Sequence, residues 1–200
     1  PDASSVTQHS VSNDDNVFAV MSNTGGYAVW KRSANSILLK ATSGSDLNEV
    51  EIDKSGRYLV ALQNDHSVNV WDLQAGPTRT KVTTQPFNHR AMGNGIVSSG
   101  CEARRLCVRN LATPNSVTFL LPADSWSYAV QQDHFAMPRN SDTWMVGTRY
   151  ATNGQSVTNA YDNEIVMIAT DGSNQVKRIA HHHSVVLNND YYATPRASAS

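Results

Sequence analysis

The sequence predicts an all-β protein, a β-propeller built from four-stranded antiparallel blades. Short runs rich in Val, Ile, Tyr, Trp and Phe recur between clusters of Asn, Asp, Gly and Ser. No stretch keeps apolar residues at helical spacing over three turns. The runs come four to a repeat of about 40–45 residues, which is the sequence signature of a propeller. We expect one domain over residues 1–200, with blades at about 5–42, 46–83, 87–122 and 132–180 and a partial fifth blade at 190–200.

The second repeat is the clearest. Its apolar runs predict strands at 49–52, 57–63, 67–73 and 78–82. Asp53 to Gly56 supply the turn between the first two strands, because Asp, Ser and Gly are the residues that turns favour. This repeat therefore fixes the order of strands and turns for the others.

The other three repeats follow the same order. We expect strands at 6–12, 17–21, 27–31 and 37–40 in the first, at 89–92, 95–98, 105–110 and 117–121 in the third, and at 135–137, 143–148, 164–169 and 176–179 in the fourth. Trp30 and Trp71 hold matching places 41 residues apart. The fourth repeat carries an insertion at about 150–161, and loops of this length are often functional.

Several short segments resemble known propeller repeats. Residues 71–73, Trp-Asp-Leu followed by Gly76, resemble the strand ending of WD40 blades. Residues 52–58 and 163–173 are similar to the turns and third strand of TolB-like bacterial propellers. The resemblance covers essentially the whole chain and implies a propeller of six to eight blades, so we expect this chain to be a partial propeller.

Composition excludes some partners. The net charge is −1 and no run of Lys or Arg occurs, so the sequence lacks the basic surface that nucleic acid requires. No apolar run approaches the roughly 18 residues of a membrane span, so we expect no membrane insertion. The low share of charged residues, 16%, favours an extracytoplasmic protein, secreted or periplasmic.

Polar residues recur at the starts of the first strands, which line the channel of a propeller. His9, Asn48, His89 and His134 fall at matching places, and Arg196 lies near the same place in the partial fifth repeat. Three imidazoles that converge would suit a divalent transition metal. The alternative is that these histidines cap the channel and hydrogen-bond to backbone and water.

We expect two further groups of residues near the end of the channel where these histidines lie. His183 closes a run of three histidines, of which at most two can face one side of a strand. Tyr191 and Tyr192, with Trp126 and Tyr128, either line a site for sugar rings or pack between blades, and packing is the favoured interpretation. We expect ligand-binding roles for Asn48, Arg196, Tyr191 and Tyr192, and metal-binding roles for His9, His89, His134 and His183.

Two functions follow. The first is a non-catalytic binding domain, without a cofactor, that presents its channel mouth and loops to a protein or glycan partner. The second is a metal-dependent lyase or hydrolase acting on an acidic oligosaccharide, since the histidine ring is similar to the metal site of oligogalacturonate-lyase propellers. Arg196 stands where that family has His, and no Gln occupies the matching place. No Gly-x-Ser-x-Gly nucleophile motif occurs.

Cys101 and Cys107 flank a short polar segment. If this segment is a hairpin loop, the two thiols could face each other and form a disulfide in an oxidising compartment. The other interpretation is two half-buried thiols that pack as small apolar groups. A zinc site is disfavoured, because two thiols are half of a ligand set.

Overall fold

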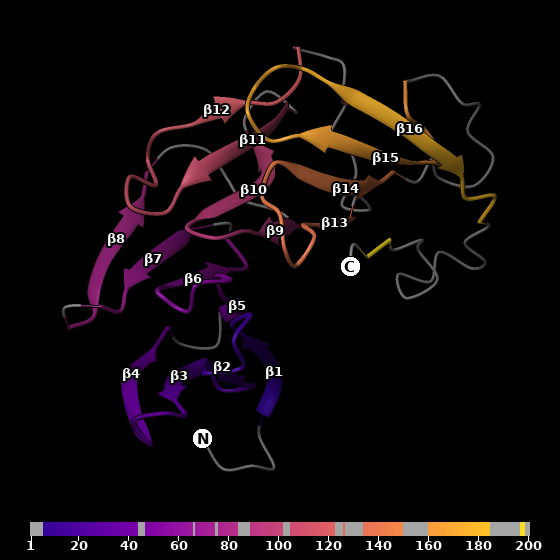
Figure 1. Ribbon diagram of the computed structural model, residues 1–200. Helices are drawn as coiled ribbons and strands as arrows, with labels where there is room; N and C mark the ends of the chain where they lie inside the picture. Colours follow the sequence, from indigo (N-terminus) through magenta and orange to yellow (C-terminus); the bar gives the residue numbers. More distant parts are fainter. Residues whose placement is uncertain are drawn as a thin grey trace. The chain divides into compact units, whose positions relative to one another are not determined.

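The computed structural model (Figure 1) describes residues 6–43, 47–65, 67–74, 76–83, 89–101, 105–122, 126, 134–149, 160–184 and 197–198. Within these residues the chain forms sixteen strands in four antiparallel sheets of four strands each, joined by turns and bends. The predicted all-β fold class is confirmed. The same residues contain no helix that is long and apolar enough to cross a membrane.

The chain divides into two compact units, which are described separately. Unit 1 comprises residues 1–87, 92–97 and 109–116, and unit 2 comprises residues 88–91, 98–108 and 117–200. The division passes through the third sheet. The prediction of a single domain stays a prediction, and the partial fifth blade at 190–200 lies almost entirely outside the described residues.

The first two sheets belong to unit 1. The first consists of β1 (Val6–Val11), β2 (Val17–Ser22), β3 (Gly26–Lys31) and β4 (Ser36–Thr42) in chain order. The second consists of β5 (Leu47–Ile52), β6 (Tyr58–Gln63), β7 (Val68–Asp72) and β8 (Thr78–Val82). These bounds agree with the sequence prediction to within about two residues, because alternation and turn residues specify strand ends locally.

The third and fourth sheets have the same order. The third consists of β9 (Arg90–Met92), β10 (Ile96–Cys101), β11 (Arg105–Asn110) and β12 (Thr118–Phe119). The fourth consists of β13 (His134–Ala136), β14 (Trp144–Thr148), β15 (Glu164–Ala169) and β16 (Val176–His181). Prediction was least accurate in the third sheet, where β10 continues three residues further than expected and β12 has two residues instead of five.

One backbone hydrogen bond recurs in every sheet and shows that the four repeats are equivalent. The amide after the third strand donates to the carbonyl just before the second strand. The pairs are Arg32 to Asn16 (2.8 Å), Leu73 to Arg57 (2.9 Å), Leu111 to Gly95 (2.8 Å) and Thr170 to Thr143 (3.0 Å). Asn16, Arg57, Gly95 and Thr143 therefore hold the same position in successive repeats.

Packing between the first two sheets forms one of the hydrophobic cores of unit 1. Buried Ala19 and Val29 of the first sheet belong to one cluster with Val50, Leu59 and Ala61 of the second. Polar side chains add to this contact at the inner edge. The Gln8 carbonyl accepts from the Val50 amide (3.2 Å) and the Ser10 hydroxyl accepts from the Ile52 amide (3.0 Å), each across one repeat of 42 residues.

The turn after β5 connects the second repeat to the third within unit 1. The fully buried Asp53 carboxylate accepts from the Tyr58 amide (2.7 Å) and from the Gly95 amide (2.9 Å). The Lys54 amide also donates to the Gly93 carbonyl (3.0 Å). Asp53 thus closes its own turn and holds the next turn in place.

Cys101 and Cys107, both buried, form a disulfide between β10 and β11. Their Cα atoms are 6.0 Å apart, within the range that a disulfide spans. The structure therefore selects the first of the two interpretations of these cysteines. Sequence alone left the choice open, because it did not show that the two side chains share one interior face.

Candidate functional site

His89 and His134, two of the predicted ring histidines, lie together in unit 2. Their imidazole rings stack with centroids 4.6 Å apart and planes inclined by 19°. The in-plane lone pairs of near-parallel rings do not converge on one point, so a shared metal ion would require one side chain to rotate. Among the described residues, no group of three or more His, Cys, Asp or Glu side chains could hold a metal ion.

The other predicted site residues are not part of this pair. His9 is exposed on β1 in unit 1, and Asn48 donates to the Asn64 side chain (2.7 Å) on the surface of the second sheet. His183 is exposed and its ring lies 5.9 Å from that of His181. Tyr191, Tyr192 and Arg196 lie outside the described residues. The metal site and the alternative lyase or hydrolase activity stay predictions that rest on His89 and His134.

Trp126 packs instead of lining a site. It is 1% exposed, and its ring contacts Phe135 and Tyr161, with centroids 6.0 Å and 5.7 Å away. Trp126 is therefore a packing residue, as favoured, although these two contacts lie within the fourth repeat and packing between blades stays a prediction. A buried indole offers no platform on which a sugar ring could stack.

An ion pair between buried Glu164 and exposed Arg178 stabilises the fourth sheet. The carboxylate of Glu164 accepts two hydrogen bonds from the Arg178 guanidinium, one from Nε at 2.6 Å, and the Glu164 side chain is 5% exposed. Hydrogen bonding to Arg178 outweighs burial and lowers the pKa of Glu164 below its ordinary value of 4.5. The ionised form is therefore the one that the fold stabilises.

We expect Glu164→Gln to lower the free energy of unfolding by about 1–2 kcal/mol at pH 7. Because the folded pKa is lowered, this contribution is present above pH 4.5 and is lost as the pH falls through the folded pKa. Urea unfolding of both proteins between pH 7 and pH 3 measures it. Asp15→Asn removes one exposed carboxylate as the control. A difference that does not shrink toward pH 3 would contradict this account.

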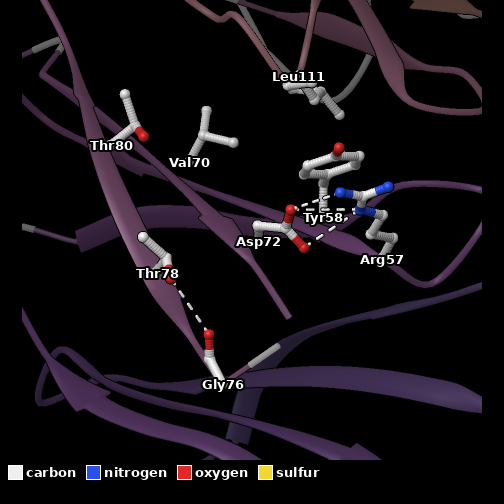
Figure 2. A pocket seen from close by; sticks show the side chains of 9 residues that line it. Arg57, Tyr58, Val70, Asp72, Gly76, Thr78, Thr80 and Leu111 are labelled. Atoms are coloured by element: carbon white, nitrogen blue, oxygen red, sulfur yellow. Dashed lines mark hydrogen bonds and ion pairs between the residues drawn. The ribbon is translucent and has the colours of Figure 1, made fainter. Parts of the chain in front are cut away.

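The candidate binding site is a pocket of about 340 Å³ in unit 1, between the outer strands of the second sheet and the turn after β11 (Figure 2). Val70, Leu111 and Ala112 form its apolar floor. Its polar groups lie toward one end of the second sheet, where Tyr58, Asp72 and Thr78 are opposite one another. They are Arg57, Tyr58, Asp72, Thr78 and Thr80.

Arg57 and Asp72 form a fixed ion pair at one side of this pocket (Figure 2). Nε of Arg57 lies 3.2 Å and 3.3 Å from the two carboxylate oxygens, and Nη2 lies 2.7 Å from Oδ2. Hydrogen bonding to Arg57 lowers the pKa of Asp72, despite partial burial. Nη1 takes no part in these bonds, so this donor group remains for a ligand.

Tyr58 is the pocket's second donor. Its side chain is buried, at 5% exposure, and the Arg57 guanidinium lies over its ring at 4.8 Å. Among the described residues, no group hydrogen-bonds to its hydroxyl. Burial raises the pKa of Tyr58, so the phenol stays protonated at neutral pH. Because Tyr58 lines the pocket, its hydroxyl is a donor that a ligand in the pocket can use.

The strand beside the pocket is the outer edge of its sheet. Among the described strands, β8 pairs with β7 alone, and its residues Thr78 to Lys81 are exposed. At the far end of β8 the Asn115 side chain accepts from the Thr83 amide (2.7 Å) and donates to the Lys81 carbonyl (3.4 Å). The side-chain amide of Asn115 thus forms the kind of hydrogen bonds with this sheet edge that the backbone of an added strand would form.

Sequence reasoning did not identify this pocket. Asp72 was noted for the Trp-Asp strand ending and Arg57 for the turn, but the two were not connected. The register that pairs Tyr58 with Asp72 places Arg57 beside that carboxylate. An antiparallel pairing of the second and third strands of the repeat could have suggested the ion pair in advance.

Solved structures that are similar to this chain have the same kind of fold. Over 88% of this chain, it is similar to the structure described as "Structure of U3-55K", with a TM-score of 0.58 and 14% identity. Over 90%, it is similar to "Crystal structure of RRP9 WD40 repeats", with a TM-score of 0.59 and 14% identity. It spans 51% and 52% of those two chains, about half of their length.

These similarities support a WD40-like propeller fold for this chain. No family model matches the sequence, and no curated protein matches it. The resemblance to TolB-like propellers stays a prediction. At 14% identity the likeness to the two solved structures shows the fold alone.

Proposed function

We propose that this chain is a non-catalytic interaction domain that binds an extended, acidic segment of a protein partner along β8. One observation carries the proposal: the pocket beside β8 combines an apolar floor with the Tyr58 hydroxyl, to which no described residue hydrogen-bonds. A ligand that supplied an acceptor in the pocket would hydrogen-bond to this donor.

The form of the ligand follows from the strand beside the pocket. An extended segment can add to a sheet edge through its backbone while alternate side chains enter pockets. β8 offers such an edge, and Asn115 already bonds to part of it in this manner. One side chain of the added segment would then reach Tyr58 and Nη1 of Arg57.

The charge of the ligand follows from the donors. Nη1 of Arg57 and the Tyr58 hydroxyl both donate, and Arg79 and Lys81 are exposed on β8 itself. A carboxylate accepts from two donors at once, and charge-assisted hydrogen bonds are the stronger kind. These groups together favour a segment that carries Asp or Glu.

The protonation states support binding over catalysis at this pocket. The pKa of Asp72 is lowered by Arg57 and the pKa of Tyr58 is raised by burial. Both shifts move the groups away from neutral pH, whereas an acid or base catalyst works best with a pKa near the operating pH. The disulfide between Cys101 and Cys107 supports an extracytoplasmic setting, since disulfides persist in oxidising compartments.

The experiment is fluorescence anisotropy with a labelled peptide of alternating Glu and Val. We expect Arg57→Gln and Tyr58→Phe each to weaken binding by about tenfold, because each removes one donor to the carboxylate. Tyr27→Phe is the matched control, since the Tyr27 hydroxyl accepts from Trp71 Nε1 (3.1 Å) inside the fold. It should leave peptide binding unchanged.

Two results would contradict the proposal. If the wild-type protein bound the Glu peptide and a peptide with Lys in place of Glu equally well, the proposed acidic character of the bound segment would be wrong. Equal affinity of wild type and Tyr58→Phe for the Glu peptide would show that the pocket is not the site.

A further inference from the structure

The two faces of β8 carry different chemistry. Thr78 and Thr80 line the pocket together with Val70 of β7 (Figure 2). Arg79 and Lys81 alternate with these threonines along the strand, so their side chains lie on the opposite face of the sheet. A segment that extends along β8 would therefore meet the pocket on one face and two cations on the other.

The face opposite the pocket is positively charged. Arg79 and Lys81 are both exposed, and the Arg79 guanidinium lies over the ring of Trp71, 5.9 Å from its centroid. Trp71 is itself held in place, because its Nε1 donates to the Tyr27 hydroxyl (3.1 Å). In the part of the chain that the structure describes, no carboxylate forms an ion pair with Arg79 or Lys81. Both cations can therefore pair with carboxylates of a ligand.

The pocket face selects its ligand in another way. Arg57 and Asp72 form an ion pair there, with Nη2 of Arg57 2.7 Å from Oδ2 of Asp72, so the two together add no net charge. The pocket therefore offers hydrogen-bond donors to a carboxylate, whereas the opposite face offers uncompensated positive charge. The two faces make separate contributions to the recognition of an acidic segment.

The backbone of β8 determines which side chains of an added strand would reach each face. The Lys81 carbonyl and the Thr83 amide bond to the Asn115 side chain, so the backbone groups of these alternate residues point to the open edge. The same orientation recurs every second residue, so the amide and carbonyl of Arg79 point to that edge as well. Residues directly opposite each other on paired strands have side chains on the same face. A residue added opposite Arg79 or Lys81 would thus point to the charged face, and its neighbours would point to the pocket face.

We infer that the segment bound along β8 is a run of consecutive acidic residues, in which both faces of the added strand carry carboxylates. The inference rests on the proposed function and names the sequence that this edge selects. One carboxylate of the run reaches the Tyr58 hydroxyl and Nη1 of Arg57, and the carboxylates on either side of it reach Arg79 and Lys81. Complementary charge at such a surface contributes to specificity and to the rate of association.

The experiment compares two labelled peptides of equal length by fluorescence anisotropy, one of consecutive Glu and one of alternating Glu and Gln. Gln keeps the size of Glu and removes its charge. We expect the wild-type protein to bind the consecutive peptide about tenfold more tightly, because only that peptide presents carboxylates to both faces at once. The double variant Arg79→Gln/Lys81→Gln should bind the two peptides nearly equally. Both substituted side chains are exposed, and circular dichroism verifies that the variant folds.

Arg32→Gln/Lys40→Gln is the matched control, since it removes two exposed cations that lie outside β8 and should preserve the difference between the peptides. Equal affinity of the wild-type protein for the two peptides would overturn the inference. So would a tenfold difference that persists in the Arg79→Gln/Lys81→Gln variant. In either case, weaker binding of the alternating peptide by Tyr58→Phe would show that the proposed pocket still stands. A wild-type protein that binds neither peptide would overturn both.

Discussion

Asp53→Ala should lower the free energy of unfolding by about 2–4 kcal/mol, because a buried amide and a half-buried amide lose a charged acceptor. The carboxylate is fully buried and accepts from Tyr58 and Gly95, which belong to successive repeats. Alanine leaves the Tyr58 N–H buried without that partner. Chemical denaturation followed by tryptophan fluorescence measures the loss.

Asp14→Ala is the control for this substitution. Asp14 is exposed, and its carboxylate accepts from Ser12 and Asn16 within a single turn. Water can replace it there, so we expect a loss below about 1 kcal/mol. Similar losses for the two variants would show that Asp53 does not connect the second repeat to the third.

Gly56→Ala should lower the free energy of unfolding by about 2–4 kcal/mol, through backbone strain and a steric clash together. Gly56 has a φ of +72°, in the left-handed region that residues with a Cβ disfavour. An added Cβ would lie 2.8 Å from Cγ2 of Val17 in the core of unit 1. The turn would have to move away from β2.

Gly76→Ala separates the two causes. Gly76 has a φ of +90°, but a Cβ there would meet no atom within 4 Å. Its loss should be about 1 kcal/mol, from backbone conformation alone. If the two alanine variants were equally stable, close packing of the Gly56 turn on Val17 would not matter.

Local patterns in the sequence were sufficient to predict where the strands lie. Apolar residues and flanking turns placed β11 and β15 at their observed bounds, because a strand needs only its own pattern and flanking turns to be recognised. The recurrence of Trp30 and Trp71 at one repeat likewise predicted equivalent blades. The third sheet was predicted least well, since its short outer strand, β12, depends on contacts with β11 more than on its own residues.

Contacts between repeats decided which of the predicted site residues lie together. The sequence aligned His9, His89 and His134. The rings of His89 and His134 stack in unit 2, whereas His9 lies on β1 in unit 1. Side-chain direction depends on strand register, and a shift of one residue moves a side chain to the other face. Alignment of a repeat therefore cannot by itself place a side chain in a channel.

By itself, the sequence determined that this protein is all-β, with four repeats of four strands and the turns between them, because these features depend on residues that are neighbours in the chain. Only the tertiary structure decided the Cys101–Cys107 disulfide, the pairing of Arg57 with Asp72 and the position of Tyr58 at the pocket. Those features depend on which side chains the pairing and packing of strands bring together. Hydrophobic burial is non-directional, so a local pattern shows that a residue packs but not against what.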